Sequence, residues 1–184
     1  MTNILVIGLG LIGGSLVKSL KSKNKNSKKN NYRIWAIDKN KKNIESALKE
    51  KYIERGFCNY SKIKEAFDFA DIIIICAFPS VALNMIEKYK DLIDDKKIIS
   101  DFCGVKKDIF DAVSNKKYVG LHIMAGKEKG GYINSTESLF KNSNAIILSN
   151  DKAKKEDIKK IEKLSKDIGC GKIIFSTAKK HDYM

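Results

Sequence analysis

Apolar residues fall into short, strongly hydrophobic runs, and amphipathic stretches separate these runs. The runs predict strands at residues 3–7, 32–37, 71–77, 97–101, 118–121, 145–149 and 172–175. The stretches between them predict helices that cover residues 16–20, 41–51, 63–69, 80–91, 106–114 and 152–168. Runs of isoleucine, such as residues 72–75, are typical of a parallel sheet that is covered on both faces. The alternation therefore predicts an α/β fold with a doubly wound, mostly parallel sheet.

Two segments depart from this alternation. Residues 22–31 (SKNKNSKKNN) are polar and have no apolar periodicity, so we expect an exposed loop there. Near the end of the chain, Thr177 is a suitable N-cap, and residues 177–184 resemble the first turn of a further helix. Because a domain rarely stops inside a first helical turn, we expect residues 1–176 to form one domain and residues 177–184 to begin a linker to another.

Composition limits the class of protein. The chain has 184 residues, of which 43% are hydrophobic, and this is enough for one sizeable core. It has no apolar run of about 18 residues and no signal-peptide pattern at its start, so we expect a soluble, cytoplasmic protein that does not bind membranes. Its four cysteines form no CxxC pair, and no histidine lies at zinc-finger spacing from them. We therefore expect reduced thiols, with no disulfide and no metal site.

The formal net charge of +14 raises the question of nucleic-acid binding. The excess is almost all lysine and is spread through every segment, with no arginine cluster and no basic stretch interleaved with aromatic residues. This distribution argues against a nucleic-acid partner. A basic surface would still attract a dinucleotide or a dicarboxylate substrate.

A glycine motif follows the first predicted strand directly. In the sequence GLGLIG, Gly8 permits a tight turn, Gly10 lets the backbone approach a pyrophosphate, and Gly13 allows the helix to pack against the strand. Leu11 and Ile12 lie within this motif as further cofactor-binding candidates, and the helix that follows it offers free N–H groups and a positive dipole end to phosphates. This arrangement predicts a dinucleotide-binding domain of the Rossmann type.

Asp38 ends the second predicted strand, where an acid in such domains accepts hydrogen bonds from the ribose hydroxyls. A carboxylate there favours NAD over NADP, although Lys39 and Lys41 could reach a 2′-phosphate. The spacing from Gly13 to Asp38 is longer than the usual separation of about 20 residues. The polar insertion at residues 22–31 accounts for the difference.

His122 is the candidate catalytic residue. It is one of two histidines, and histidine is the side chain best suited to exchange a proton near neutral pH. It comes directly after the strand predicted at residues 118–121, at the edge where ligands bind in open α/β sheets. The glycine-rich loop that follows contains a carboxylate, Glu128.

Several motifs together resemble the NAD-binding domain of the prephenate/arogenate dehydrogenase family, in order and spacing, over essentially the whole chain. They are GLGLIGGS at residues 8–15, Ala77-Phe78-Pro79, SDFCGVK at residues 100–106, HIMAGKE at residues 122–128, Leu139-Phe140 and His181-Asp182.

This resemblance implies an NAD-dependent enzyme of tyrosine biosynthesis. Its reaction would be the oxidative decarboxylation of prephenate to 4-hydroxyphenylpyruvate, or of arogenate to tyrosine. By matching, His122 accepts the hydrogen bond of the substrate hydroxyl, Ala77 and Pro79 border the cofactor, and Gly104 and Glu128 border the substrate. The resemblance also implies a helical dimerisation domain after this chain, and hence a homodimer of the full-length protein.

Three positions depart from the family pattern. Gly104 stands where many members have a serine that orients the histidine, Ile123 replaces a proline, and Lys127 replaces a small hydroxyl residue. Two other functions stay open. One is an NAD-linked reductase of the 6-phosphogluconate or pyrroline-carboxylate type, which shares the N-terminal glycine motif but does not usually have the HIMAG loop. The other is a non-catalytic domain that senses NAD, which the missing serine keeps open.

Overall fold

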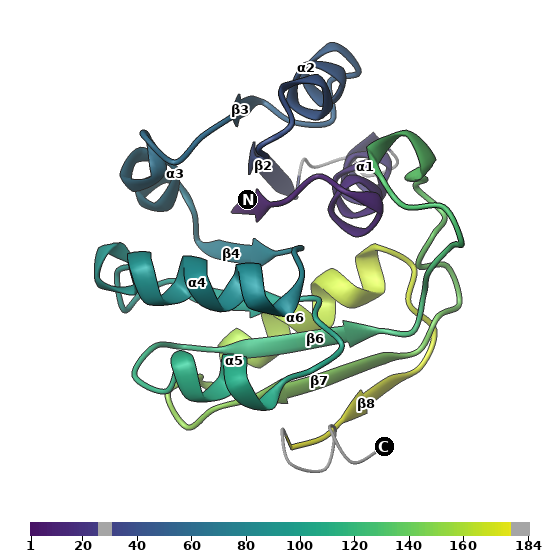
Figure 1. Cartoon of the computed structure of the whole chain (residues 1–184). Helices are drawn as coiled ribbons and strands as arrows, with labels where there is room; N and C mark the ends of the chain where they lie inside the picture. Colours follow the sequence, from purple (N-terminus) through teal and green to yellow (C-terminus); the bar gives the residue numbers. More distant parts are fainter. Residues whose placement is uncertain (26–30, 178–184) are drawn as a thin grey trace.

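A five-stranded parallel sheet forms the centre of the molecule (Figure 1). The computed structural model describes residues 1–25 and 31–177. The strand order is β3-β2-β1-β4-β5. The strands are β1 (Thr2–Ile7), β2 (Tyr32–Ile37), β3 (Arg55–Phe57), β4 (Ile72–Ile75) and β5 (Ile98–Asp101). In the central strand, Ile4 pairs with Ile34 on one side and with Ile72 on the other.

Three further strands form a second sheet in the order β6-β7-β8. They are β6 (Val119–Ile123), β7 (Ala145–Ser149) and β8 (Ile173–Phe175). A parallel bridge between Ile99 and Tyr118 connects β5 to the start of β6. The expectation of a mostly parallel sheet is confirmed, but β6 runs antiparallel to β7. The segment between these two strands contains only a short 3-10 helix, η2 (Tyr132–Asn134), in place of the long helix that usually connects parallel strands.

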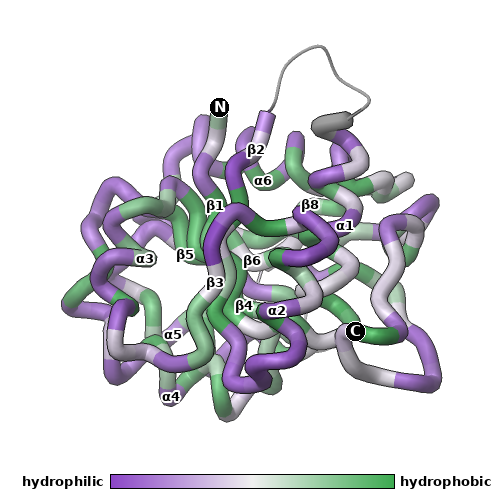
Figure 2. Tube along the Cα trace, turned by 90° about the horizontal axis from the view of Figure 1, so that it is seen from above, coloured by the Kyte–Doolittle hydropathy of each residue, from purple (hydrophilic) through white to green (hydrophobic). Residues whose placement is uncertain are grey.

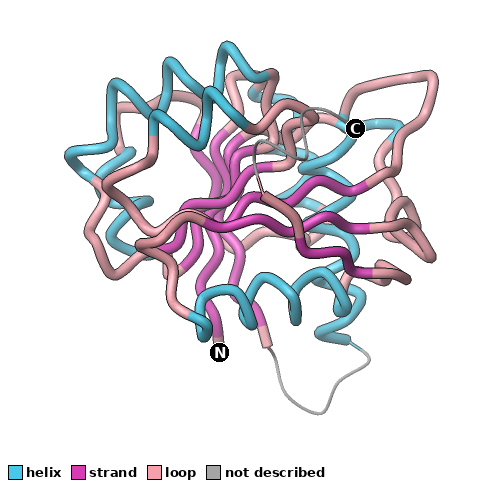
Figure 3. Tube along the Cα trace, turned by 90° about the horizontal axis from the view of Figure 1, so that it is seen from below, coloured by secondary structure: helices cyan, strands magenta, loops and turns pink. Residues whose placement is uncertain are grey.

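Helices cover both faces of the sheets (Figure 3). The α-helices are α1 (Leu11–Lys25), α2 (Lys41–Lys49), α3 (Ile63–Phe69), α4 (Pro79–Tyr89), α5 (Lys107–Ala112) and α6 (Lys155–Asp167). A 3-10 helix, η1 (Lys90–Leu92), follows α4. Residues of α1, α2 and α6 share one hydrophobic cluster, and residues of α3, α4 and α5 share the other.

The central strands supply both clusters. In β1, Ile4 and Val6 belong to the first cluster, whereas Leu5 and Ile7 belong to the second. Figure 2 shows hydrophobic segments through the centre of the molecule and hydrophilic segments around it. This two-sided burial explains why the strands are continuous apolar runs without polar alternation.

Some local predictions differ from the structure. β3 was missed because Arg55–Phe57 is too short to show a pattern. Residues 22–25 of the polar stretch continue α1, since lysine is a good helix former even without an apolar face. Residues 26–30 and 178–184, including the expected final helical turn and His181-Asp182, lie outside the described residues. In the described ranges, no helix is long and apolar enough to cross a membrane.

Candidate functional site

A cavity of about 750 Å³ opens at the carboxyl ends of β1, β2, β4 and β5. Because β1 lies between β2 and β4, this is the point where the strand order reverses, and open α/β sheets bind ligands there. The cavity volume lies within the range of small-molecule and cofactor sites. The sequence-predicted residues that line it are Gly8, Gly10, Leu11, Ile12, Asp38, Ala77, Pro79 and Gly104.

The glycine turn between β1 and α1 has little room for side chains. Gly8 has φ +95°, and a Cβ there would lie 2.5 Å from the carbonyl oxygen of Cys76. A Cβ on Gly13 would overlap with the carbonyl oxygen of Gly8. By contrast, a Cβ on Gly10 would meet no atom within 4 Å, because Gly10 faces the open cavity. Gly8 and Gly13 therefore shape the turn, and Gly10 leaves space for a ligand.

Asp38 holds this turn from the end of β2. One carboxylate oxygen accepts a hydrogen bond from the Leu9 N–H at 2.5 Å, and the other accepts from the Asn40 N–H at 2.7 Å. The Asn43 amide donates to the Leu9 carbonyl at 3.1 Å and also lies 3.4 Å from Asp38. Asn43 was not among the residues predicted from the sequence, although its place in the first turn of the helix after Asp38 could have indicated it.

Tyr60 is another cavity residue that the sequence did not indicate. Its ring stacks on the ring of Tyr89, with 5.4 Å between the centroids. Burial, followed by the proximity of Tyr89 and Asp38, raises the pKa of the Tyr60 hydroxyl above its usual value. The hydroxyl therefore stays protonated and can donate a hydrogen bond in the cavity.

His122 lies inside β6, and the prediction that it follows the strand was wrong. The strand continues because Leu121 and Ile123 point into the core, while His122, on the opposite face, is half-buried. His122 pairs with Ile146 of β7. A Cβ on Gly104 would lie 4.0 Å from Nε2 of His122. The structure thus brings these two predicted residues together: Gly104 lines the cavity, and His122 lies behind it without being among the lining residues.

The loop after His122 also contributes to the cavity. Gly130 and Gly131 line it, and Gly131 has φ +89°. Glu128 is exposed and is not among the described residues that line the cavity. Its role toward the substrate stays a prediction.

One face of α1, here called the α1 clamp and formed by Gly14, Ser15, Lys18 and Ser19, holds the segment at residues 132–137. Ser15 Oγ accepts a hydrogen bond from the Thr136 N–H at 3.0 Å. Lys18 donates to the Ser135 carbonyl at 3.1 Å, and Ser19 donates to the Glu137 carbonyl at 2.8 Å. A Cβ on Gly14 would lie 2.7 Å from Ser135 Oγ. The clamp therefore fixes the segment that follows Gly130 and Gly131.

Two thiols border the cavity, those of Cys76 and Cys103. Burial raises the pKa of the Cys76 thiol well above its usual value, and it raises the pKa of Cys103 to about 12. Both thiols stay protonated at neutral pH, so neither is a ready nucleophile. No cluster of potential metal ligands occurs in residues 1–25 and 31–177.

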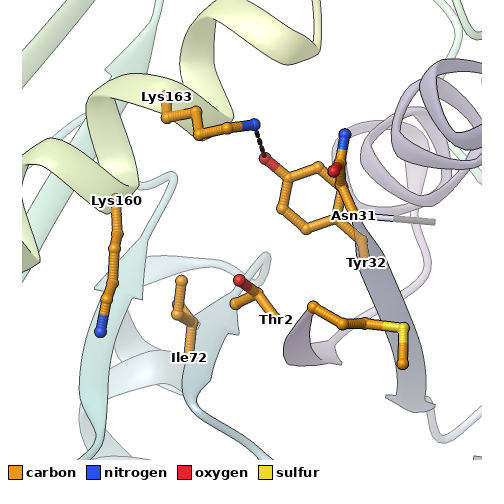
Figure 4. A pocket seen from close by; sticks show the side chains of 7 residues that line it. Thr2, Asn31, Tyr32, Ile72, Lys160 and Lys163 are labelled. Atoms are coloured by element: carbon orange, nitrogen blue, oxygen red, sulfur yellow. Dashed lines mark hydrogen bonds between the residues drawn. The ribbon is translucent and has the colours of Figure 1, made fainter. Parts of the chain in front are cut away.

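A second, smaller cavity of about 190 Å³ lies at the opposite ends of the central strands (Figure 4). Thr2, Tyr32 and Ile72 line it together with Lys160 and Lys163 of α6. The Tyr32 hydroxyl donates to Asp167 at 2.7 Å, and the Lys163 ammonium lies 3.4 Å from the same hydroxyl. This cavity is too small for a dinucleotide, and it has no glycine turn.

The larger cavity therefore combines a glycine turn, a helix N-terminus and an acid at the end of the second strand, all at the reversal point of a parallel sheet. These features define the chain as a Rossmann domain of the dinucleotide-binding class.

The particular family follows from comparison with known proteins. The sequence model described as "Prephenate dehydrogenase, nucleotide-binding domain" matches residues 22–174, which is most of the chain. The chain belongs to the prephenate dehydrogenase family and corresponds to its nucleotide-binding domain.

Two curated relatives agree with this assignment. Prephenate dehydrogenase of Bacillus subtilis is 32% identical over 169 residues, which cover 89% of this chain and 43% of that protein. Prephenate dehydrogenase of Lactococcus lactis is 27% identical, over 99% of this chain and 48% of that protein. The chain thus spans about half the length of these relatives.

Solved structures show the same fold. Prephenate dehydrogenase from Aquifex aeolicus superposes with a TM-score of 0.86 at 24% identity, over all of this chain and 64% of that one. Synechocystis arogenate dehydrogenase superposes with a TM-score of 0.83 at 22% identity, over 98% of this chain and 61% of that one.

Proposed function

We propose that this chain is the NAD-binding part of an enzyme that oxidises and decarboxylates prephenate to 4-hydroxyphenylpyruvate. The observation that carries the proposal is the position of His122. It lies beside Gly104, which lines the same cavity as the glycine turn. The Aquifex aeolicus relative was also solved with hydroxyphenyl propionate and NAD+, an aromatic ligand together with the dinucleotide.

The cavity fits the proposed cofactor. Gly10 leaves open space beside the N-terminus of α1, where a pyrophosphate binds through free N–H groups. The Asp38 carboxylate lies at the cavity wall, where it can accept hydrogen bonds from ribose hydroxyls. When bound, NAD supplies the acceptor for a hydride.

In the proposed reaction, His122 acts on the hydroxyl of the substrate ring. The carbon that bears this hydroxyl loses a hydride, so the hydroxyl proton becomes acidic and a neutral imidazole can accept its hydrogen bond. Loss of carbon dioxide then leaves an electron pair in the ring, which becomes aromatic. The proton remains with the phenol oxygen of the product, so His122 ends the cycle neutral.

The assay that tests this function uses the natural gene product that contains this chain. We expect formation of NADH with prephenate as substrate. Arogenate is the alternative substrate, and the rates with the two compounds decide between them. If neither compound is oxidised while NAD still binds, the domain is an NAD sensor, an alternative that the missing serine at Gly104 keeps open.

The preference for NAD over NADP gives a separate prediction. Titration of this chain with each cofactor by calorimetry should show tighter binding of NAD, because a 2′-phosphate would meet the carboxylate of Asp38. Asp38→Asn keeps an acceptor for the Leu9 N–H but removes the negative charge. This variant should therefore reduce the difference in affinity between NAD and NADP. Equal or tighter binding of NADP by the unaltered chain would contradict this prediction.

The rest of the proposed enzyme lies beyond the region that this chain shares with its relatives. We propose that the natural gene product adds a helical domain that completes the substrate site and forms a homodimer. Sedimentation of that product measures its oligomeric state, and a monomer would rule out the dimer.

A further inference from the structure

A fully buried lysine lies next to the candidate catalytic histidine. Lys106 directly precedes α5, and its side chain has no solvent exposure. Its ammonium donates to the Asp101 carboxylate at 2.6 Å and to the Asp101 carbonyl at 3.2 Å. It also donates to the carbonyl of Leu121 at 3.2 Å. Leu121 is the residue immediately before His122, so this last bond joins the end of β5 to β6 beside His122.

The same contacts fix the loop that contains Gly104. Asp101 accepts a hydrogen bond from the Cys103 N–H at 2.7 Å. The Cys103 thiol in turn donates to the carbonyl of Ala77 at 3.3 Å, next to the cavity. The Tyr118 hydroxyl donates to the second oxygen of Asp101. The Gly104 loop and β6 are therefore both held by the Asp101–Lys106 pair.

Stability alone does not account for this arrangement. Burying an ammonium and a carboxylate costs desolvation energy, and an apolar pair of similar volume often stabilises a core as well or better. What a fully hydrogen-bonded buried pair adds is one fixed geometry. The geometry fixed here is the placement of His122 opposite Gly104, where a Cβ would lie 4.0 Å from the imidazole Nε2.

We propose that Lys106, which forms an ion pair with Asp101, is a positioning residue that holds β6 at Leu121 and so sets the place of the His122 imidazole beside Gly104. Lys106 itself touches neither substrate nor cofactor, since it has no exposed surface. The inference rests on the proposed function only where activity is measured. The position of His122 can be followed without any substrate.

The first experiment observes the ring signals of His122 by NMR in this chain. The sequence contains two histidines, so a His122→Asn variant assigns the signals. We expect the double variant Lys106→Met with Asp101→Asn, which leaves no unpaired buried charge, to shift and broaden the His122 signals. Unchanged His122 signals in a folded double variant would overturn the proposal.

Lys116→Met is the matched control. Lys116 also pairs with an aspartate, Asp95 at 2.8 Å, and also donates to a backbone carbonyl, that of Ile93 at 2.9 Å. Neither partner belongs to β6 or to the Gly104 loop. We expect this variant to leave the His122 signals in place. If the His122 signals shift equally in Lys116→Met and in the double variant, the shift reflects a general loss of stability. That result would overturn the positioning role of Lys106.

A measurement on the unaltered chain covers the case in which the double variant does not fold. A buried, hydrogen-bonded ammonium exchanges its protons slowly, so Lys106 should give an ammonium signal with nuclear Overhauser contacts to the backbone protons of Leu121 and His122. Rapid exchange without these contacts would contradict the geometry.

In the natural gene product, the double variant should lower kcat by about 100-fold, the order expected for a misplaced catalytic group, and leave KM for NAD unchanged. A normal kcat together with displaced His122 signals would overturn the catalytic relevance of the positioning. If the unaltered enzyme does not oxidise prephenate at all, the proposed function fails. The NMR result then still decides whether Lys106 places His122.

Discussion

Replacing His122 with asparagine should lower the turnover of prephenate by the natural gene product about 100-fold to 10,000-fold, the usual contribution of general acid–base assistance. Asparagine keeps a polar side chain of similar reach but cannot take up a proton. Affinity for NAD should remain nearly unchanged, because His122 is not among the described residues that line the cofactor cavity. Steady-state kinetics and calorimetry measure the two quantities.

Two further results bear on the same residue. The rate of the unaltered enzyme should fall in acid, because a protonated imidazole no longer accepts the hydrogen bond. Normal turnover by His122→Asn would remove the histidine from the mechanism and support the sensor alternative.

A companion change restores the serine at position 104. A Cβ on Gly104 would meet only Nε2 of His122, at 4.0 Å, so the backbone environment accepts the Cβ of a serine. Its hydroxyl can then orient the imidazole, so Gly104→Ser should raise kcat. The thermal stability of this variant serves as the control, and lower activity at unchanged stability would show that the glycine itself is required.

The second large effect is expected in the glycine turn, where Gly13 and Gly10 form a matched pair. Gly13→Ala should abolish NAD binding, because the added Cβ overlaps with the Gly8 carbonyl oxygen and forces α1 away from β1. Overpacking of this kind also typically costs about 1–3 kcal/mol of stability. Gly10→Val should weaken NAD binding as well, since its side chain fills the space of the pyrophosphate.

The two variants should differ in stability. Gly10→Val should leave the Tm unchanged, because a Cβ at this position meets nothing in the free chain. Gly13→Ala should lower it. Thermal unfolding with and without NAD separates the two mechanisms. Retained affinity in Gly10→Val would mean that the pyrophosphate does not pass this residue.

Local sequence was sufficient for much of this fold. The apolar runs predicted seven of the eight strands that residues 1–25 and 31–177 form, because each buried strand is hydrophobic on both faces. The glycine turn was recognisable because its residues are adjacent in sequence, and Asp38 because the strand before it ends there. The bounds of individual elements were predicted less well. The last turn of α1 lies in the polar stretch that was predicted as a loop, and His122 was placed after the strand that in fact includes it.

The features that sequence could not show are contacts between distant residues. Nothing local distinguishes Lys106 from the other lysines of this basic chain, and its burial depends on a carbonyl in β6. The antiparallel direction of β7 and the stacking of Tyr60 on Tyr89 also arise only when separate segments meet. For Glu128 the opposite holds: its place in a motif was recognisable from the sequence, but the motif gave no information about where its side chain lies.

The α1 clamp makes a single helix contact two parts of the cavity wall. The N-terminal turn of α1 faces the dinucleotide cavity, and the next turn holds the segment that continues from Gly130 and Gly131. A displacement of this helix would therefore act on the cavity wall at Gly130 and Gly131 as well. If occupancy of the cavity shifts α1, the order of the held segment will change with it, and by reciprocity a change in that segment will alter ligand affinity by the same factor.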